Sequence, residues 1–164
     1  MKRHLLLKNY LLRENDKFYM SDDWMLPCSN ISNKIGHTHD FYEFFIVTNG
    51  QITQQFNEEV VTLSEKEIQI LAPGDYHAIG ATFEKSKIRN IAVDADYFEH
   101  RLSLLSNKGK LTSKIFFLDT HTYNELIEKT EAIHKSHKAR WFSYNKRQGW
   151  SNLDIRYGGV KERC

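Results

Sequence analysis

The middle of the chain alternates apolar and polar positions at the two-residue period of a β-strand. Ile52, Gln54 and Phe56 are separated by polar residues, whereas residues 41–48 are aromatic and β-branched on both faces. The second pattern predicts a strand that is covered on both sides. Further short strands are expected at residues 60–63, 68–70, 77–79 and 88–93. Turns are expected at Asn49-Gly50 and Pro73-Gly74. Many short strands with frequent turns predict a β-sandwich or barrel.

Helical periodicity replaces the alternation after Asp94. Apolar residues recur at helical spacing within residues 97–105, and Asp94 or Asp96 is a suitable N-cap. A second helix is predicted from Thr122, because Thr122 and Glu125 have the spacing of a capping box. The expected inward side of this helix carries Leu126, Ile127, Thr130, Ile133 and His134.

The remaining segments carry weaker patterns. Residues 1–26 contain leucines that fit short strands, while Asp22-Asp23 and residues 27–33 are expected to form a turn and a loop. Residues 115–118 are expected to be a short buried extended run. The expected organisation is an N-terminal arm and barrel at 1–93, a helical segment of the same domain at 94–140, and an irregular tail at 141–164.

The candidate chemistry is concentrated in the segment HTHDFYEFFIVTNG, residues 37–50. In an extended strand, His37, His39 and Glu43 lie on one face. His77 follows a Pro-Gly turn and is the expected fourth ligand from a neighbouring strand. Three imidazoles and a carboxylate suit a divalent transition metal such as zinc, nickel, iron, manganese or copper. A polar cluster held together by hydrogen bonds is the alternative interpretation of the same residues.

These residues also carry a resemblance to a known family. The pattern HxHxxxE, followed by six residues and then Gly50, resembles the first cupin motif. Gly74-x-x-His77 resembles the core of the second motif, although Ala72 and Lys66 stand where that motif usually has proline and glycine. The stretches HTHDFYEFFIVTNG and LAPGDYHAI are still more similar to the sensor domains of AraC-type sugar-operon regulators, those of chitobiose and cellobiose operons above all.

This resemblance covers residues 30–100 well. It implies a mostly β fold, a cupin double-stranded β-helix or jelly-roll barrel followed by C-terminal α-helices. It also implies a sensor that binds a sugar or sugar phosphate in the barrel and forms a homodimer through the helices after it. DNA would be contacted only through a helix-turn-helix region, which is not predicted within this chain.

A metal-dependent cupin enzyme, such as a dioxygenase or sugar isomerase, is the alternative function. There the same four residues would leave coordination positions open for substrate. No acid–base pair is evident beside the ligands, so no catalytic residue is assigned and a protein without catalytic activity is expected.

Aromatic and polar residues near the motifs are candidate contacts for an organic ligand. A sugar ring stacks its apolar face on an aromatic side chain while its hydroxyls form hydrogen bonds. The candidates on this basis are Phe41, Phe45, Phe56, Asp75 and Tyr76. The three phenylalanines equally suit a barrel core, and Asp75 equally suits the turn that it follows.

Composition restricts the partners and the compartment. A chain of 164 residues can form one domain with a proper core. A net charge of +2 does not favour nucleic-acid binding by the chain as a whole. Cys28 and Cys164 form no CxxC pair, which fits a reducing cytosol. The N-terminal run of three leucines is too short for a signal peptide or a membrane span, so we expect a cytoplasmic protein without membrane contact.

Overall fold

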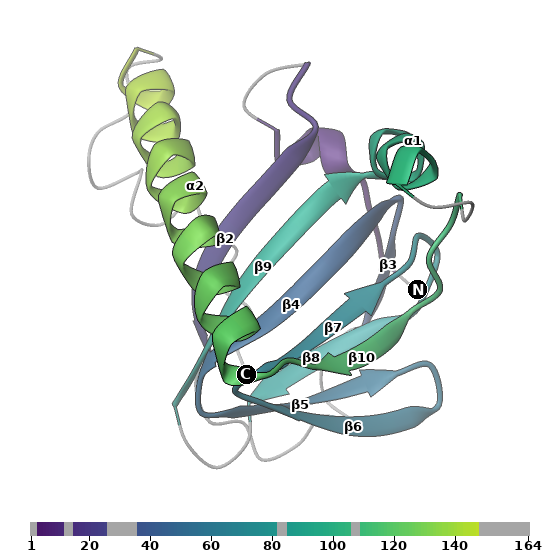
Figure 1. Ribbon diagram of the computed structural model, residues 1–164. Coiled ribbons are helices and arrows are strands. Elements are labelled where there is room, and N and C mark those ends of the chain that lie inside the picture. The colour runs from purple at the N-terminus through teal and green to yellow at the C-terminus, as the bar shows by residue number, and fades with distance from the viewer. Residues whose placement is uncertain (1–2, 12–14, 26–35, 82–84, 106–108, 148–164) are drawn as a thin grey trace.

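The computed structural model describes residues 3–11, 15–25, 36–81, 85–105 and 109–147. Figure 1 shows the elements that these residues form. In chain order they are β1 (Arg3–Leu5), the 3-10 helix η1 (Leu7–Asn9), β2 (Phe18–Met25), β3 (His37–His39), β4 (Phe41–Asn49), β5 (Gln51–Phe56), β6 (Glu59–Ser64), β7 (Glu67–Leu71), β8 (His77–Ala81), β9 (Ser86–Asp94), α1 (Ala95–Leu105), β10 (Lys114–Phe117) and α2 (Thr120–Arg147). No helix in the described ranges is long and apolar enough to cross a membrane.

The strands form two five-stranded sheets. One sheet has the order β1-β3-β8-β5-β6 and the other the order β10-β7-β4-β9-β2. The described pairings are antiparallel except for that of β1 with β3. Two facing antiparallel sheets with crossovers between them are the jelly-roll arrangement of cupins. The predicted fold class, a mostly β jelly roll followed by α-helices, is confirmed.

Strand β4 holds the centre of the second sheet, between β7 and β9. Phe45 and Val47 alternate along it and both enter the apolar core. The core cluster consists of Phe45, Val47, Ile52, Leu63, Leu71 and Ile88. Glu43 lies two positions before Phe45 and therefore shares its face of the sheet. A second, smaller cluster of Leu7, Phe41 and Ala92 lies at the other end of β4, so Glu43 is placed between two apolar clusters.

Helix α2 packs on the outer face of β2 and β9, where Arg89 of β9 anchors it (Figure 1). Arg89 is 1% exposed, and its guanidinium donates to both carboxylate oxygens of Asp22 on β2 at 2.7 and 2.9 Å. It also donates to Thr130 Oγ1 at 2.8 Å and to the carboxylate of Glu131, both on α2. Burial alone would raise the pKa of Asp22, but hydrogen bonds from Arg89 and Lys87 lower it to about 2. The buried guanidinium, paired with Asp22 within the sheet, therefore links α2 to the sheet through Thr130 and Glu131.

The turn predicted at Asp22-Asp23 is wrong, because both residues lie inside β2. Adjacent acidic residues usually mark solvent-exposed turns. Here the Asp22 carboxylate is paired with Arg89, while Asp23 accepts a hydrogen bond from Ser21 at 2.6 Å. The partner that makes an acidic residue tolerable in this strand is 67 positions away in sequence.

The capping box predicted at Thr122 is also wrong. Helix α2 begins at Thr120, and its cap is Asp119, whose Oδ1 accepts the N–H groups of His121 and Thr122 at 2.9 and 3.0 Å. The first helix is capped as predicted, because Asp94 accepts the N–H of Tyr97 at 2.8 Å.

Two further differences concern the C-terminal part. The run at 115–118 is not buried as expected, because β10 is an edge strand on which Phe117 is 74% exposed. The irregular structure expected from residue 141 is not found at 141–147, since α2 continues to Arg147. A helix needs an apolar stripe only where it packs on another element, so loss of the stripe did not mark the end of this one. Residues 148–164 of the expected tail lie outside the described ranges.

Candidate metal centre

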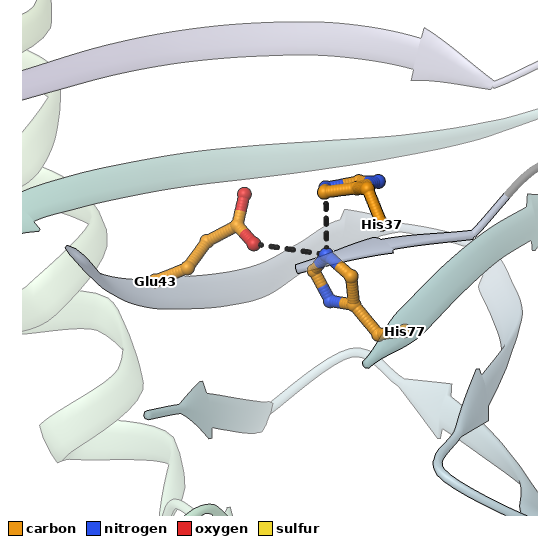
Figure 2. A group of neighbouring side chains, drawn as sticks. All are labelled: His37, Glu43 and His77. Carbon is orange, nitrogen blue, oxygen red and sulfur yellow. Dashed lines mark hydrogen bonds and ion pairs between the residues drawn. The ribbon is translucent and has the colours of Figure 1, made fainter. Parts of the chain in front are cut away.

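Three of the predicted ligands come from three strands and meet at one place (Figure 2). His37 lies on β3, Glu43 on β4 and His77 on β8, and one ligand atom of each is within 4.8 Å of the other two. Nε2 of His77 is 2.8 Å from Nε2 of His37 and 3.3 Å from Oε2 of Glu43. The register of β3 with β8 sets His37 opposite His77, so strand pairing unites residues 40 positions apart.

His39, the fourth predicted ligand, approaches the same carboxylate. Its Nε2 is 3.3 Å from Oε2 of Glu43. Its Nδ1 is 2.6 Å from the carbonyl oxygen of Phe41, which can only accept, so Nδ1 carries the proton and Nε2 carries a lone pair. That Nε2 is buried and has no hydrogen-bond partner among the described residues. A ring lone pair therefore points at a carboxylate oxygen.

Burial favours the neutral form of all three imidazoles. Burial and the nearby ring of His39 lower the pKa of His37 to about 4. Burial, followed by the nearby rings of His37 and His39, lowers the pKa of His77 to about 2. Burial also lowers the pKa of His39, although the hydrogen bond to the Phe41 carbonyl opposes this shift. Neutral imidazole is the form that binds metal ions.

His37, Glu43 and His77 bring ligand atoms within 4.8 Å of one another, and these donor types suit a divalent transition metal. A tetrahedral shell of about 2.1 Å radius places neighbouring ligand atoms about 3.4 Å apart. The 3.3 Å separations of the Glu43 oxygen from the His39 and His77 nitrogens have this size. Three imidazoles with one carboxylate suit the first-row metals, and the donor set alone does not select one of them.

Two amide side chains that the sequence analysis did not assign touch the ligands. Asn90 Nδ2 donates to Oε1 of Glu43 at 2.7 Å, and Gln54 Nε2 lies 2.9 Å from Nδ1 of His77. A signal for both existed in the sequence. Each is a polar residue at an inward position of a strand whose other inward positions are apolar, Ile52 beside Gln54 and Ile88 beside Asn90.

Aromatic rings border the ligand cluster. Phe41 stacks on His39 with ring centroids 4.5 Å apart and an interplanar angle of 19°. The centroid of Phe45 lies 5.7 Å from that of His77. Both phenylalanines are buried. They shield the imidazoles from water on these sides.

The other predicted ligand-binding residues do not contact one common site, although Phe56 is the cross-strand neighbour of His77. Phe56 and Asp75 line a pocket of about 430 Å³ that none of the four predicted metal ligands touches. Its remaining lining residues are Tyr42, Ala72, Pro73, Glu99, Lys110, Leu111, Thr112 and Ser113. Tyr76 does not line it. The Tyr76 ring covers Gly36 so closely that a Cβ there would lie 2.3 Å from it.

The pocket is held in shape by hydrogen bonds between its own walls. Ser113 donates to the Asp75 carboxylate and accepts the N–H of Ala72 at 2.6 Å. Tyr42 O–H donates to Glu99 Oε1 at 3.0 Å. The segment after α1 is thereby tied to the turn before β8.

A sequence comparison finds a family match in the C-terminal part of the chain. Residues 102–164 match the family described as the Glycoside Hydrolase 20C C-terminal domain. None of the four predicted metal ligands lies in that segment. No curated protein matches the chain in sequence.

Solved structures resemble the chain over more of its length. Unsaturated fatty acid bound wild-type ToxT from Vibrio cholerae strain SCE256 is 12% identical, with a TM-score of 0.53, and the match covers 84% of this chain and 54% of ToxT. Apo ToxT K231A gives 12% identity, a TM-score of 0.52, and coverage of 82% and 57%. A cupin-2 domain containing protein from Shewanella frigidimarina NCIMB 400 is 24% identical, with a TM-score of 0.41, over 49% of this chain and 74% of that one.

The likeness to ToxT concerns the fold, since the identity is low. The chain spans just over half the length of ToxT. Together with the two-sheet topology, these findings define the chain as a domain with the cupin fold followed by helices.

Proposed function

We propose that this chain is the small-molecule-sensing domain of an AraC-type transcriptional regulator and that its barrel holds a divalent transition metal. His37, His39, Glu43 and His77 would be the metal ligands. The observation that best supports a bound metal is the buried lone pair of His39 Nε2, which faces Oε2 of Glu43 at 3.3 Å. Two such electron-rich atoms repel each other at this distance unless a proton or a metal cation lies between them.

The regulator assignment has two independent supports. The structural likeness to ToxT, a regulator of the AraC type, covers 84% of the chain and so exceeds the barrel. The residues around the metal motif resemble those of AraC-type sensors of sugar operons. A regulator of this type would contact DNA through a region outside this chain.

The pocket lined by Phe56 and Asp75 is the site that we propose for the organic ligand. Phe56 provides an aromatic wall, and the carboxylates of Asp75 and Glu99 can accept hydrogen bonds from hydroxyl groups. Two carboxylates against the one cation Lys110 disfavour a fatty-acid carboxylate or a sugar phosphate. A neutral sugar is therefore the proposed ligand class, and a bound metal would supply a separate Lewis-acidic point in the barrel.

Metal binding is tested first. Purified protein stripped with a chelator should take up about one Co²⁺, Ni²⁺ or Zn²⁺ per chain in equilibrium dialysis, and Glu43→Gln should abolish this uptake. The exposed residue His100 provides the control, because His100→Ala should bind as the parent does. Equal metal content in the Glu43→Gln variant and the parent would overturn the metal centre.

The sensor role is tested with defined sugars. N,N′-diacetylchitobiose and cellobiose should raise the unfolding temperature of the metal-loaded protein. Asp75→Asn should reduce that rise without removing the metal. Metal-dependent oxygen consumption or sugar isomerisation by the same preparation would instead establish the rival, a metal-dependent cupin enzyme.

A further inference from the structure

Gln54 of β5 is fully buried beside the ligand cluster and is not itself a predicted ligand. Its side-chain Nε2 lies 2.9 Å from Nδ1 of His77. Its Oε1 is buried and has no hydrogen-bond partner among the described residues. The amide nitrogen of Gln54 thus contacts Nδ1 of His77, whereas its amide oxygen has no hydrogen-bond partner among the described residues.

The direction of this contact decides which nitrogen of His77 is available. If the Gln54 amide group donates, Nδ1 accepts and the ring proton resides on Nε2. Nε2 is the atom where the two dashed lines of Figure 2 meet, 2.8 Å from His37 and 3.3 Å from Glu43. A protonated Nε2 can donate to these neighbours, but it has no lone pair for a metal.

Turning the Gln54 amide by half a rotation reverses the contact. Oε1 then accepts a proton from Nδ1, and Nε2 of His77 presents its lone pair to Glu43 and His37. The same rotation gives the unsatisfied Oε1 its missing partner. We propose that Gln54 is the positioning residue that selects the metal-binding tautomer of His77, a role that rests on the metal centre proposed above.

The partners of His39 and Glu43 have fixed hydrogen-bond roles, which sets Gln54 apart. His39 donates to the carbonyl of Phe41, and a backbone carbonyl cannot become a donor. Asn90 donates to Oε1 of Glu43, which leaves the orientation of that carboxylate settled. The outer partner of a metal-bound histidine generally fixes its tautomer and orientation. Of the two histidines His39 and His77, only His77 has an outer partner that offers both a donor and an acceptor.

The test compares three variants by titrating the chelator-stripped protein with Co²⁺ and following its visible absorption. Gln54→Leu cannot accept a hydrogen bond and should bind Co²⁺ about 10- to 100-fold more weakly than the parent. Gln54→Glu can only accept and should restore binding to within about threefold. Gln69→Leu is the matched control, because Gln69 is also a buried barrel glutamine but has no hydrogen bond to a ligand. It should bind as the parent does.

Nitrogen NMR of the histidine rings provides a readout that a purely structural role would not move. Metal-free parent protein should show His77 protonated at Nε2, and the Gln54→Glu variant should show it protonated at Nδ1. Gln54→Met keeps the unbranched shape and replaces Gln54→Leu should that variant not fold. A parent that binds Co²⁺ while Gln54→Leu and Gln54→Met bind it equally well overturns this role alone. A parent that binds none overturns the metal centre, and equal losses in Gln54→Leu and Gln69→Leu also overturn the role of Gln54.

Discussion

Asn90 and Arg89 are neighbours on β9 and bind opposite sides of the sheet. Asn90 donates to Glu43 inside the barrel at 2.7 Å, whereas Arg89 reaches outward to Asp22 and to Glu131 of α2. Side chains of adjacent strand residues point to opposite faces, so one short stretch of backbone holds both the candidate metal ligand and the helix. Two consecutive residues of β9 thus make the contact with Glu43 and the contact with α2.

The outward contacts of Arg89 predict that substituting this residue strongly lowers the free energy of unfolding. Arg89→Met removes the buried cation and leaves the half-buried carboxylate of Asp22 with Lys87, 3.0 Å away, in place of its main partner. Breaking a buried pair on one side costs about 3–5 kcal/mol of unfolding free energy. Urea unfolding followed by circular dichroism measures this loss.

Lys135→Met is the control for Arg89→Met, because Lys135 pairs with the same Glu131 at 3.5 Å but is 74% exposed. Exposed pairs are worth about 0–1 kcal/mol. Equal and small effects of the two substitutions would show that the buried guanidinium does not anchor α2.

The ligand cluster inside the barrel predicts that loss of one ligand lowers the metal content and leaves the fold intact. His39→Ala removes the Nε2 lone pair that faces Glu43, so metal uptake should fall to background. The apolar core cluster around Phe45 lies further along β4 and is untouched, so the β-sheet circular dichroism should be retained. Elemental analysis of the variant and the parent provides the measurement. A variant that keeps the full parental metal content would remove His39 from the ligand set.

Strand periodicity was sufficient to predict a sandwich or barrel and to place three candidate ligands on one strand face. The structure brings His37, Glu43 and His77 together, and His39 lies beside the same carboxylate. His37, His39 and Glu43 lie in an almost uninterrupted extended stretch, where alternation fixes the face of each side chain. His77 could be added because the turn at Pro73-Gly74 leads from β7 to β8, the strand that pairs with β3. Gly74 N–H does bond to the carbonyl of His39 at 2.9 Å.

The sequence did not predict the contacts that depend on long-range pairing. Asp22 and Arg89 are charged residues that local patterns place in solvent, and only the β2–β9 register and the helix above it bury them. Gln54 and Asn90 were overlooked for a related reason. The role of a polar residue in an apolar strand depends on the ligand that it contacts. For Gln54 and Asn90 that ligand lies on another strand.

The histidine cluster predicts a pH dependence for the metal-free protein. The pKa of His37 is lowered to about 4 from an ordinary value of 6.5, so the unfolded chain binds more protons between these values. Stability is therefore complete above about pH 6.5 and falls as the pH decreases toward 4. His77, with its pKa lowered to about 2, extends the loss below that range.

Urea midpoints between pH 7 and pH 4 measure this dependence. The range excludes most of the contribution of Asp22, whose carboxylate titrates from an ordinary value of 3.8 downward. His37→Gln should flatten the slope between pH 6.5 and 4, since the substituted side chain does not titrate. A parent protein whose midpoint rises on acidification would contradict the neutral state of these imidazoles.

The last prediction concerns self-association through α2. Ile133 is 42% exposed on the helix that Arg89 fixes to the sheet, while Thr130, one turn before it, is buried against that sheet. A two-fold pairing of such helices buries the exposed apolar side chain in the commonest form of oligomer. Light scattering should give about twice the chain mass of 19.4 kDa for the parent, and Ile133→Glu should reduce it to the mass of one chain. Val60, 64% exposed on the edge strand β6, provides the matched control, because Val60→Glu introduces the same charge away from α2 and should leave the dimer intact. A parent that is monomeric at every concentration, or a dimer that Val60→Glu dissociates and Ile133→Glu does not, would exclude α2 as the dimer surface.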